Sequence, residues 1–482
     1  MEPVVFDKPL KIDRRPIWLI LADRTLRYQV FAGLLIAGAV LFSLTPPEGL
    51  SVAGYRSLIV FGVSIFFWVS GLLPLAVTSL LAMAALPLLG IMEAKKTYAL
   101  FGNEAVFFIL GAFILGAAMT GSGLSSRMAR AMLARFGRTP KSLVLTVFLL
   151  SAILSFCMSE HAVAAMMFAV VAEIVRSLGL EPSRSRYGKL LFMAIGWGCV
   201  IGGIATFLGG ARAPLAVGML QENTGLDFSF FEWTLAAGAL VLPLLLLGFT
   251  LLLRFFPPDL ANVDKGLVFL NRKRLETGRM SWDEKIVALI MLLTLLGWVL
   301  LGKTLGLANI AILAVVALFV FRVVSWQAIE EYVNWGVILM YGGAIALASA
   351  LEKSGAAQWL AGHGLAGLQD SPFLAVAVIS LIAMLLTECI SNAAVIAILM
   401  PIGLSLAKTM GMDPRIITLA IALPAGLAYC LPMGTPANAI VYSSGFLRSR
   451  EMILPGAVIM ACSWGLFLLT ARFVWPLLGF KI

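Results

Sequence analysis

Apolar runs about as long as a membrane-spanning helix recur along nearly the whole chain. A helix needs about 20 predominantly apolar residues to cross the hydrocarbon core of a bilayer. The sequence offers many such runs, and only 12% of its 482 residues are charged, whereas about a quarter are charged in a soluble domain. The pattern therefore predicts an all-α polytopic membrane protein.

The apolar runs divide into eleven expected transmembrane helices and two longer stretches. The expected helices cover residues 29–45, 56–74, 76–93, 102–124, 190–220, 232–254, 285–302, 307–324, 334–352, 415–446 and 452–476. The stretches 142–176 and 372–407 are too long for one helix, and each has polar residues at its middle. We interpret both as re-entrant hairpins, because interrupted backbone at membrane depth is tolerated only where protein or water surrounds it.

Lysine and arginine are unevenly distributed among the loops. With the N-terminus placed in the cytoplasm, 25 of the 35 Lys and Arg residues fall on the cytoplasmic side. Cytoplasmic loops of membrane proteins carry such an excess. It supports the eleven spans, a cytoplasmic N-terminus and an outside C-terminus, in what we expect to be a bacterial inner membrane. The basic loops then face the lipid bilayer, and we expect no nucleic-acid partner because no nucleic-acid-binding module is recognisable.

These assignments divide the chain into four segments. We expect a cytoplasmic N-terminal segment (1–28), a first half (29–256) with an inner hairpin and the broken helix 190–220, a cytoplasmic linker (257–284), and a second half (285–482) with an outer hairpin and the broken helix 415–446. The linker is a candidate for an amphipathic surface helix.

The two halves share three matched blocks in the same order. SFCMSEH (155–161) resembles TECISNA (387–393) at an offset of 232 residues. FGNEAVFFILGAF (101–113) resembles YVNWGVILMYGGA (332–344), and CVIGG (199–203) resembles CLPMG (430–434), both at 231. Five expected spans separate the hairpins, so the second enters from the opposite face. An inverted repeat with interrupted helices is typical of secondary transporters.

The breaks in the apolar runs are suited to binding ions. Gly and Pro interrupt helical hydrogen bonding around residues 202–214 and 431–438, which frees backbone carbonyls and amides. Carbonyl and hydroxyl oxygens suit a hard cation such as Na⁺, and amides at helix N-termini suit an anion. A site with both kinds of group is what a cation-coupled anion carrier needs.

The second-half motifs carry a family resemblance. The TE-x-x-SN tip and GTPANAIVYSSG (434–445) resemble the divalent anion:sodium symporter family of the ion transporter superfamily, which carries dicarboxylates, citrate and sulfate. The resemblance extends from about residue 55 to the end of the chain. It implies a homodimer in which a transport domain moves against a scaffold domain as an elevator. It also implies Na⁺-coupled symport of a small anionic substrate and no enzymatic activity.

In the second half, the resemblance assigns both an ion and a substrate role. Thr387, Ile390, Asn392 and the Gly434 carbonyl resemble one sodium site. Ser391, Asn392, Ala393, Thr435 and Pro436 resemble the substrate wall of that half. Ala393 departs from the family pattern, which has Thr there, so a hydroxyl is missing.

In the first half, the resemblance is partial. Ser155, Ser159 and the Gly203 carbonyl resemble the other sodium site, and Ser159, Glu160, His161 and Arg212 occupy the substrate positions. Glu160 and His161 stand where the family has Asn and Thr, and Arg212 lies in a break that differs from the family's Thr-Pro-Pro-Asn type. One or two sodium sites are therefore compatible with the sequence, and our hypothesis is that only the second-half site is kept.

Three roles for the first-half charges stay open. Arg212 either binds the anionic substrate, since its planar fork matches a carboxylate or sulfate, or forms a static buried network with Glu160 and His161. Alternatively, His161 couples transport to protons. The corresponding alternatives to sodium symport are anion exchange, proton-coupled carriage, and cation antiport of the same superfamily. Glu388 is expected to hold its hairpin through backbone amides.

Overall fold

The computed structural model describes residues 29, 33, 37, 38, 40–182, 184–364, 367 and 371–480, which contain helices and no strands. This confirms the all-α fold. The described residues divide into two units at residue 47, and the fold and site below lie in the second, from Glu48 onward. The expected segment 1–28 lies outside the described residues. Within the expected span 29–45, all described positions up to residue 43 are helical.

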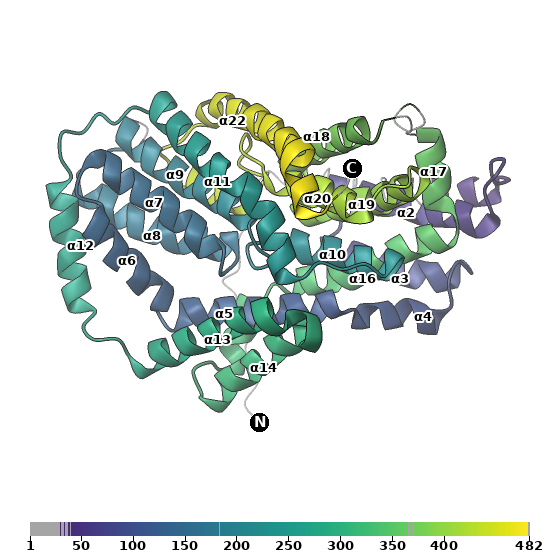
Figure 1. Ribbon diagram of the computed structural model, residues 1–482, viewed down its shortest axis with the longest axis horizontal. Coiled ribbons are helices and arrows are strands. Elements are labelled where there is room, and N and C mark those ends of the chain that lie inside the picture. Colours follow the sequence, from purple (N-terminus) through teal and green to yellow (C-terminus); the bar gives the residue numbers. More distant parts are fainter. Residues whose placement is uncertain are drawn as a thin grey trace. The chain divides into compact units, whose positions relative to one another are not determined.

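The helices follow the expected runs closely (Figure 1). The first half contains α2 (Val52–Ser70), α3 (Leu75–Leu88), α4 (Ala94–Ala99), η1 (Leu100–Gly102), α5 (Glu104–Gly121), α6 (Leu124–Phe136), α7 (Pro140–Ser155), α8 (Glu160–Ser177), α9 (Arg186–Gly203), α10 (Arg212–Thr224) and α11 (Phe230–Phe255). The linker contains α12 (Asp264–Glu276). The second half contains α13 (Trp282–Leu305), α14 (Leu307–Val320), α15 (Trp326–Tyr332), α16 (Trp335–Lys353), α17 (Ala356–Gly364), α18 (Pro372–Cys389), α19 (Asn392–Thr409), α20 (Pro414–Ala422), η3 (Pro424–Gly426), α21 (Pro436–Tyr442), α22 (Ser449–Leu469), η4 (Thr470–Val474) and η5 (Trp475–Leu478).

Eight helical segments in the described residues are long and apolar enough to cross a membrane. They include both α18 and α19, and four further apolar helices are shorter. The expected number of eleven spans therefore stays a prediction, as does the side of the membrane from which each hairpin enters.

Each of the two long apolar stretches forms a pair of helices joined by a short break. α7 and α8 are separated by residues 156–159, and α18 and α19 by residues 390–391. α7 and α18 both begin at a proline, and the starts of α8 and α19 are again 232 residues apart. Ser159 and Ser391 cap α8 and α19 by accepting hydrogen bonds from the amides of Ala162 (3.4 Å) and Ala394 (3.2 Å), as N-cap serines do. The spacing of the sequence repeat is thus a spacing of helix boundaries.

The first hairpin packs against α9, the most deeply buried helix of the first half. Two glycines permit this approach, because a Cβ atom at Gly198 would lie 2.5 Å from the Phe148 carbonyl oxygen and one at Gly202 would lie 2.3 Å from that of Ala152. Small residues at helix contacts let membrane helices pack closely. The end of α9, where the backbone breaks, is therefore held next to the tip of the hairpin.

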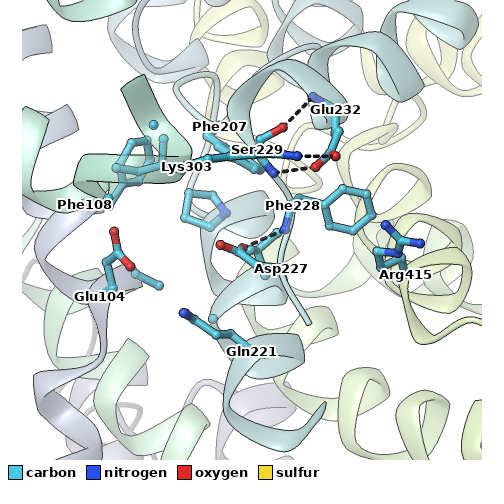
Figure 2. A pocket seen from close by; sticks show the side chains of 17 residues that line it. Glu104, Phe108, Phe207, Gln221, Asp227, Phe228, Ser229, Glu232, Lys303 and Arg415 are labelled. Carbon is cyan, nitrogen blue, oxygen red and sulfur yellow. Dashed lines mark hydrogen bonds and ion pairs between the residues drawn. The ribbon is translucent and has the colours of Figure 1, made fainter. Parts of the chain in front are cut away.

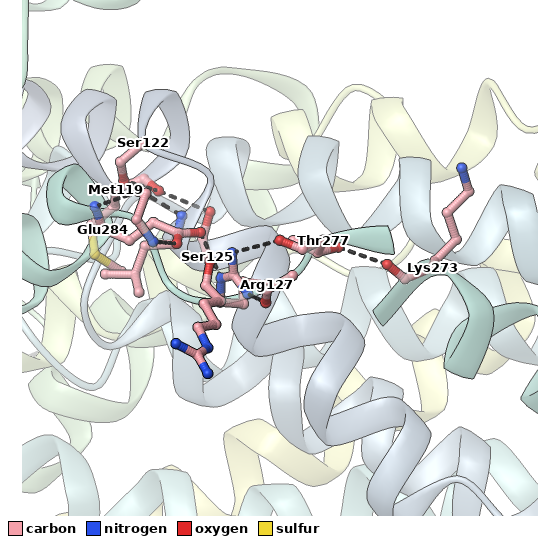
Figure 3. Close-up of polar contacts among 11 residues, drawn as sticks. Met119, Ser122, Ser125, Arg127, Lys273, Thr277 and Glu284 are labelled. Atoms are coloured by element: carbon pink, nitrogen blue, oxygen red, sulfur yellow. Dashed lines mark hydrogen bonds and ion pairs between the residues drawn. The ribbon is translucent and has the colours of Figure 1, made fainter. Parts of the chain in front are cut away.

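Arg127 holds the end of the linker against the first half (Figure 3). Arg127 on α6 donates from Nε to Glu284 Oε1 (2.7 Å), from Nη1 to the Gly278 carbonyl (2.8 Å), and from Nη2 to the carbonyls of Thr277 and Arg279 (3.2 Å each). Residues 125–141, which lie between the expected span 102–124 and the expected hairpin 142–176 and were not expected to be helical, contain nearly all of helix α6. α6 and α12 also pack against each other.

Candidate functional site

The first hairpin tip is joined to the broken helix behind it by two hydrogen bonds to backbone carbonyls. The Glu160 amide donates to the Gly209 carbonyl (2.9 Å), and the Thr206 hydroxyl donates to the Phe156 carbonyl (2.7 Å). Residues 204–211, between α9 and α10, form turns and bends and are not helical. These bonds satisfy polar groups that the interrupted helices leave free, so the tip and the break fold as one unit.

A buried ion pair occupies the centre of the first-half break. Arg212 Nη1 and Nη2 each lie 3.3 Å from Glu160 Oε2, and the two residues are 2% and 5% exposed. A Cβ atom at Gly203 would lie 2.5 Å from Glu160 Oε2 and 3.0 Å from Arg212 Nη2. Buried charges require a partner, and here the glycine at the end of α9 provides the space for both.

Arg212 also reaches the second half of the chain. Its Nη1 lies 3.2 Å from the side-chain amide of Asn392, the first residue of α19. Its Nε and Cζ pack over Gly426, where a Cβ atom would lie 2.2 Å and 2.7 Å away. One guanidinium group therefore contacts both hairpin tips and the breaks of both halves.

The three residues in this contact share a position in their helices. Glu160, Arg212 and Asn392 are the first residues of α8, α10 and α19. The N-terminus of a helix carries partial positive charge and unpaired amides, and it favours anions. Three helix N-termini thus converge on one buried junction.

The second tip presents neutral oxygens at the positions equivalent to the ion pair. The Thr387 hydroxyl donates to the Ala425 carbonyl (2.7 Å), and the Asn392 amide lies 2.8 Å from Thr387 Oγ1 and 3.2 Å from the Gly434 carbonyl. Because a hydroxyl has one proton, Thr387 accepts from Asn392 when it donates to Ala425. The Asn392 nitrogen then faces Thr387 and Gly434, and its oxygen accepts from Arg212 Nη1.

The remaining predicted second-half residues surround this cluster. Thr387 is fully buried, and Ile390 and Ala393 are 5% and 8% exposed. Ser391 and Pro436 are exposed, and the buried Thr435 caps α21 by accepting from the Asn438 amide (3.1 Å). The predicted cation residues are therefore inside, and part of the predicted substrate wall faces outward.

Glu388 fastens the second-half break to its hairpin. Its Oε1 accepts from the amides of Tyr429 (2.7 Å) and Cys430 (2.9 Å), and its Oε2 accepts from the amide of Leu431 (2.9 Å). A carboxylate that accepts several backbone hydrogen bonds is stabilised while buried. The expectation that Glu388 acts through backbone amides is confirmed.

In the first half, the corresponding predicted residues separate into two groups. Ser155 is fully buried, and its hydroxyl has no oxygen or nitrogen partner within the described part of the chain. Ser159 and His161 line a cavity of about 630 Å³ that also borders Arg130, Glu173 and Glu331. His161 is exposed in this cavity, away from the Glu160–Arg212 pair. The structure thus brings Glu160 and Arg212 together but not His161, since consecutive residues of a helix do not face one another.

A second cavity approaches the junction along the other end of α5 (Figure 2). Its volume is about 520 Å³, and it reaches from Glu104 and Lys303 to Pro214, two residues after Arg212. Lys303 pairs with Glu232 at 2.8 Å within it. The first cavity borders α5 from Ala112 to Thr120. The two cavities thus flank the ion pair: one reaches Ser159, next to Glu160, and the other reaches Pro214.

Three residues that support the junction were not predicted from the sequence. The Tyr341 hydroxyl on α16 donates to the Ala211 carbonyl, just before Arg212. The Asn438 side chain donates to the carbonyls of Ala428 (3.1 Å) and Leu431 (3.3 Å). Gly426 lies under the guanidinium. Only Asn438 had a signal in the sequence, since it belongs to the GTPAN break.

The chain matches the family described as "Sodium:sulfate symporter transmembrane region" over residues 25–481. It belongs to that family. Two relatives in the symporter family bear out the assignment across nearly the whole length. The "Sodium-dependent dicarboxylate transporter SdcS" of Staphylococcus aureus is 31% identical, over 93% of this chain and 92% of the relative. The protein of the same name from Staphylococcus saprophyticus is 29% identical with the same coverage.

Two solved structures share the fold. Neisseria gonorrhoeae MtrF, described with a class of antimetabolite efflux pumps, superposes with a TM-score of 0.55 at 15% identity, covering 94% of both chains. The Alcanivorax borkumensis YdaH transporter superposes with a TM-score of 0.51 at 17% identity, covering 94% of this chain and 99% of that one. At these identities the likeness concerns the fold. The family and the relatives' names describe transporters and confirm that this symporter-family chain is not an enzyme.

Proposed function

We propose that this protein is a secondary active transporter that moves a small divalent anion of the dicarboxylate, citrate or sulfate class together with Na⁺. The observation that carries the proposal is the contact of Arg212 with Glu160 on one hairpin tip and Asn392 on the other. It brings two interrupted helix pairs, far apart in sequence, to one buried junction. Discontinuous helices that meet in this way form the substrate and ion sites of secondary transporters.

The surroundings of the junction suit a negatively charged solute. Three helix N-termini meet there, and the Arg212 guanidinium, whose charge is balanced by Glu160, offers further hydrogen-bond donors. Ser159 and Ser391, which cap two of these helices, and the outward-facing Pro436 form the edge of the proposed substrate site. The two cavities give a solute an approach from each end of α5, and their outermost lining residues on that helix, Glu104 and Thr120, lie about 24 Å apart along its axis.

We assign the mobile cation to the second half. Thr387 Oγ1, the Gly434 carbonyl and the Asn392 side-chain oxygen supply three neutral oxygen ligands within reach of one another. In the first half, the Glu160–Arg212 pair lies against Gly203, so a guanidinium already supplies the positive charge there. This supports one sodium site. It also favours anion exchange as the second candidate function, because the first-half position of a mobile cation is occupied by the guanidinium of a resident ion pair.

The larger-scale features belong to the same proposal. We assign the bacterial inner membrane, since the relatives are bacterial, with the N-terminus inside and the C-terminus outside. The two hairpins enter from opposite faces as an inverted repeat. The hairpins and broken helices form the moving domain of an elevator, and the remaining helices form the scaffold of a homodimer.

Uptake by the purified chain in proteoliposomes tests the function. Labelled succinate, citrate and sulfate are supplied with an inward gradient of Na⁺ or of choline. We expect Na⁺-stimulated uptake of at least one divalent anion. Asn392→Ala should abolish the stimulation, and Asn309→Ala, at an exposed asparagine of α14, should leave it unchanged.

Two outcomes contradict the proposal. The first is no transport of any divalent anion by liposomes that contain folded protein. The second is Na⁺/H⁺ exchange, reported by an internal pH dye, that no divalent anion changes, because it identifies a cation antiporter. Anion exchange without any effect of Na⁺ selects the second candidate function.

A further inference from the structure

The Asn392 side chain has two orientations that satisfy different neighbours. With its nitrogen toward Thr387 Oγ1 (2.8 Å) and the Gly434 carbonyl (3.2 Å), both contacts are hydrogen bonds, and its oxygen accepts from Arg212 Nη1 (3.2 Å). With the amide turned over, three oxygens face one another and the nitrogen faces the guanidinium. The first orientation is stable without an ion, because every donor meets an acceptor.

The second orientation is the one that a cation stabilises. In that orientation the Thr387 hydroxyl can donate to the Asn392 oxygen (2.8 Å) only by leaving the Ala425 carbonyl. The Asn392 and Gly434 oxygens, 3.2 Å apart, repel each other unless positive charge lies between them. Unwound backbone carbonyls and polar side chains coordinate Na⁺ in transporters in this manner. A cation at this position therefore recruits the Asn392 oxygen and withdraws it from Arg212.

Withdrawal of that oxygen changes what Arg212 can bind. Arg212 is buried, and its acceptors in the described part of the chain are Glu160 and the Asn392 oxygen. A guanidinium is donor-only and carries five N–H groups, of which three have these acceptors, so loss of Asn392 leaves one more N–H group of Nη1 without an acceptor, on the side that faces the second hairpin tip. A carboxylate or sulfate oxygen restores the hydrogen bond and brings negative charge to the helix N-termini.

We propose that the Asn392 amide is the coupling element between the two ions: the cation turns it over, and this frees an Arg212 donor for the anion. This mechanism rests on the proposed function and adds a route by which one ion raises affinity for the other. Both ends of the route are residues of this chain, Thr387 with Gly434 at the cation end and Arg212 at the anion end. Coupling between two binding sites is reciprocal, so the anion raises the affinity for the cation by the same factor.

Equilibrium binding to the purified protein in nanodiscs tests the coupling without transport. Succinate, citrate and sulfate are titrated calorimetrically with Na⁺ and with choline, and ²²Na⁺ binding is measured with and without the anion that binds. For the wild-type chain we expect Na⁺ to lower the anion Kd by about 5–150-fold, and the anion to lower the Na⁺ Kd by the same factor.

The double variant Glu160→Gln/Arg212→Gln separates the amide mechanism from direct attraction between the ions. It keeps both positions polar and avoids an unpaired buried charge. We expect it to bind Na⁺ as the wild type does and to lose the effect of Na⁺ on the anion Kd. Arg272→Gln, at an exposed arginine of α12 paired with Glu276, is the matched control and should keep the full coupling factor.

Asn392→Asp provides a second variant if the double variant does not fold. A carboxylate accepts on both oxygens, so the substituted side chain binds the cation and Arg212 together, and Na⁺ no longer frees a donor. We expect Na⁺ binding to be kept and anion binding to be weak at every Na⁺ concentration. An unchanged coupling factor in either variant overturns the amide mechanism. Failure of the proposed function itself is distinguishable, because the wild-type chain then shows no Na⁺-dependent anion binding.

Discussion

The two halves of the chain place their breaks at equivalent positions and fill them with different chemistry. Glu160 and Asn392 are repeat partners, 232 residues apart, and each opens the second helix of its hairpin. In the first half, a carboxylate and a guanidinium are locked together at 3.3 Å. In the second, Thr387, Asn392 and Gly434 offer neutral oxygens. The comparison shows that one backbone arrangement accommodates either a buried ion pair or a cluster of neutral oxygens.

The difference also predicts how much stability is lost when a residue in either break is substituted. A buried ion pair depends on both members, because either one alone leaves an uncompensated charge. A cluster of neutral groups depends on hydrogen bonds that contribute less each. Substitutions in the first-half pair should therefore cost more stability than those that remove a single hydrogen bond.

The largest effect is expected for Glu160→Ala. It leaves Arg212 buried without its counter-ion, and removal of one partner of a buried pair costs about 3–5 kcal/mol. Thermal or denaturant unfolding in detergent measures the loss. The double variant Glu160→Leu/Arg212→Leu should regain most of the stability, because an apolar pair replaces the charged one. A double variant as unstable as the single one would show that the ion pair is not the cause.

A smaller effect is expected for Glu388→Gln in the second half. Glutamine keeps the shape but presents an NH₂ group to backbone amides that now donate to a carboxylate, which should cost about 1.5–3 kcal/mol. The free energy of unfolding of this variant is compared with that of Glu352→Gln, whose carboxylate pairs with the exposed Lys408. Equal stability of the two variants would mean that the three amide hydrogen bonds do not hold the break.

The smallest effect is expected for Thr206→Val, which removes one of the two hydrogen bonds between the first hairpin tip and its break. The Phe156 carbonyl loses its donor and the Leu208 amide loses its acceptor; both bonds are neutral, and we expect a loss of about 0.5–1.5 kcal/mol for each. The same unfolding measurement applies. A loss of stability as large as that of Glu160→Ala would mean that single hydrogen bonds to the backbone stabilise the first half as much as the ion pair does. The two halves would then not differ in what stabilises them.

Much of the helical framework was predictable from the sequence. The stretches 142–176 and 372–407 agree within two residues with the outer ends of α7–α8 and α18–α19, because polar residues within apolar runs mark the breaks. Helix α6 was missed because its arginines suggested a loop. Its buried face is narrow, formed by Leu124, Ala129, Leu133 and their neighbours.

The tertiary contacts of the junction were less accessible to sequence reasoning. Pairing of Glu160 with Arg212 was anticipated, since an isolated charge at membrane depth is costly. The reach of Arg212 to Asn392 and Gly426 was not, because repeat offsets describe each half and not how the halves meet. His161 was grouped with its neighbour in sequence, although the helix turns it toward the cavity.

The number of Na⁺ ions carried with each anion tests the central contrast between the halves most directly. Simultaneous uptake of ²²Na⁺ and a labelled divalent anion into proteoliposomes gives the ratio. A fixed pair in the first half and one cation site in the second predict one Na⁺ per anion and a Na⁺ dependence without cooperativity. A ratio of two or more, with a Hill coefficient clearly above one, would contradict this account.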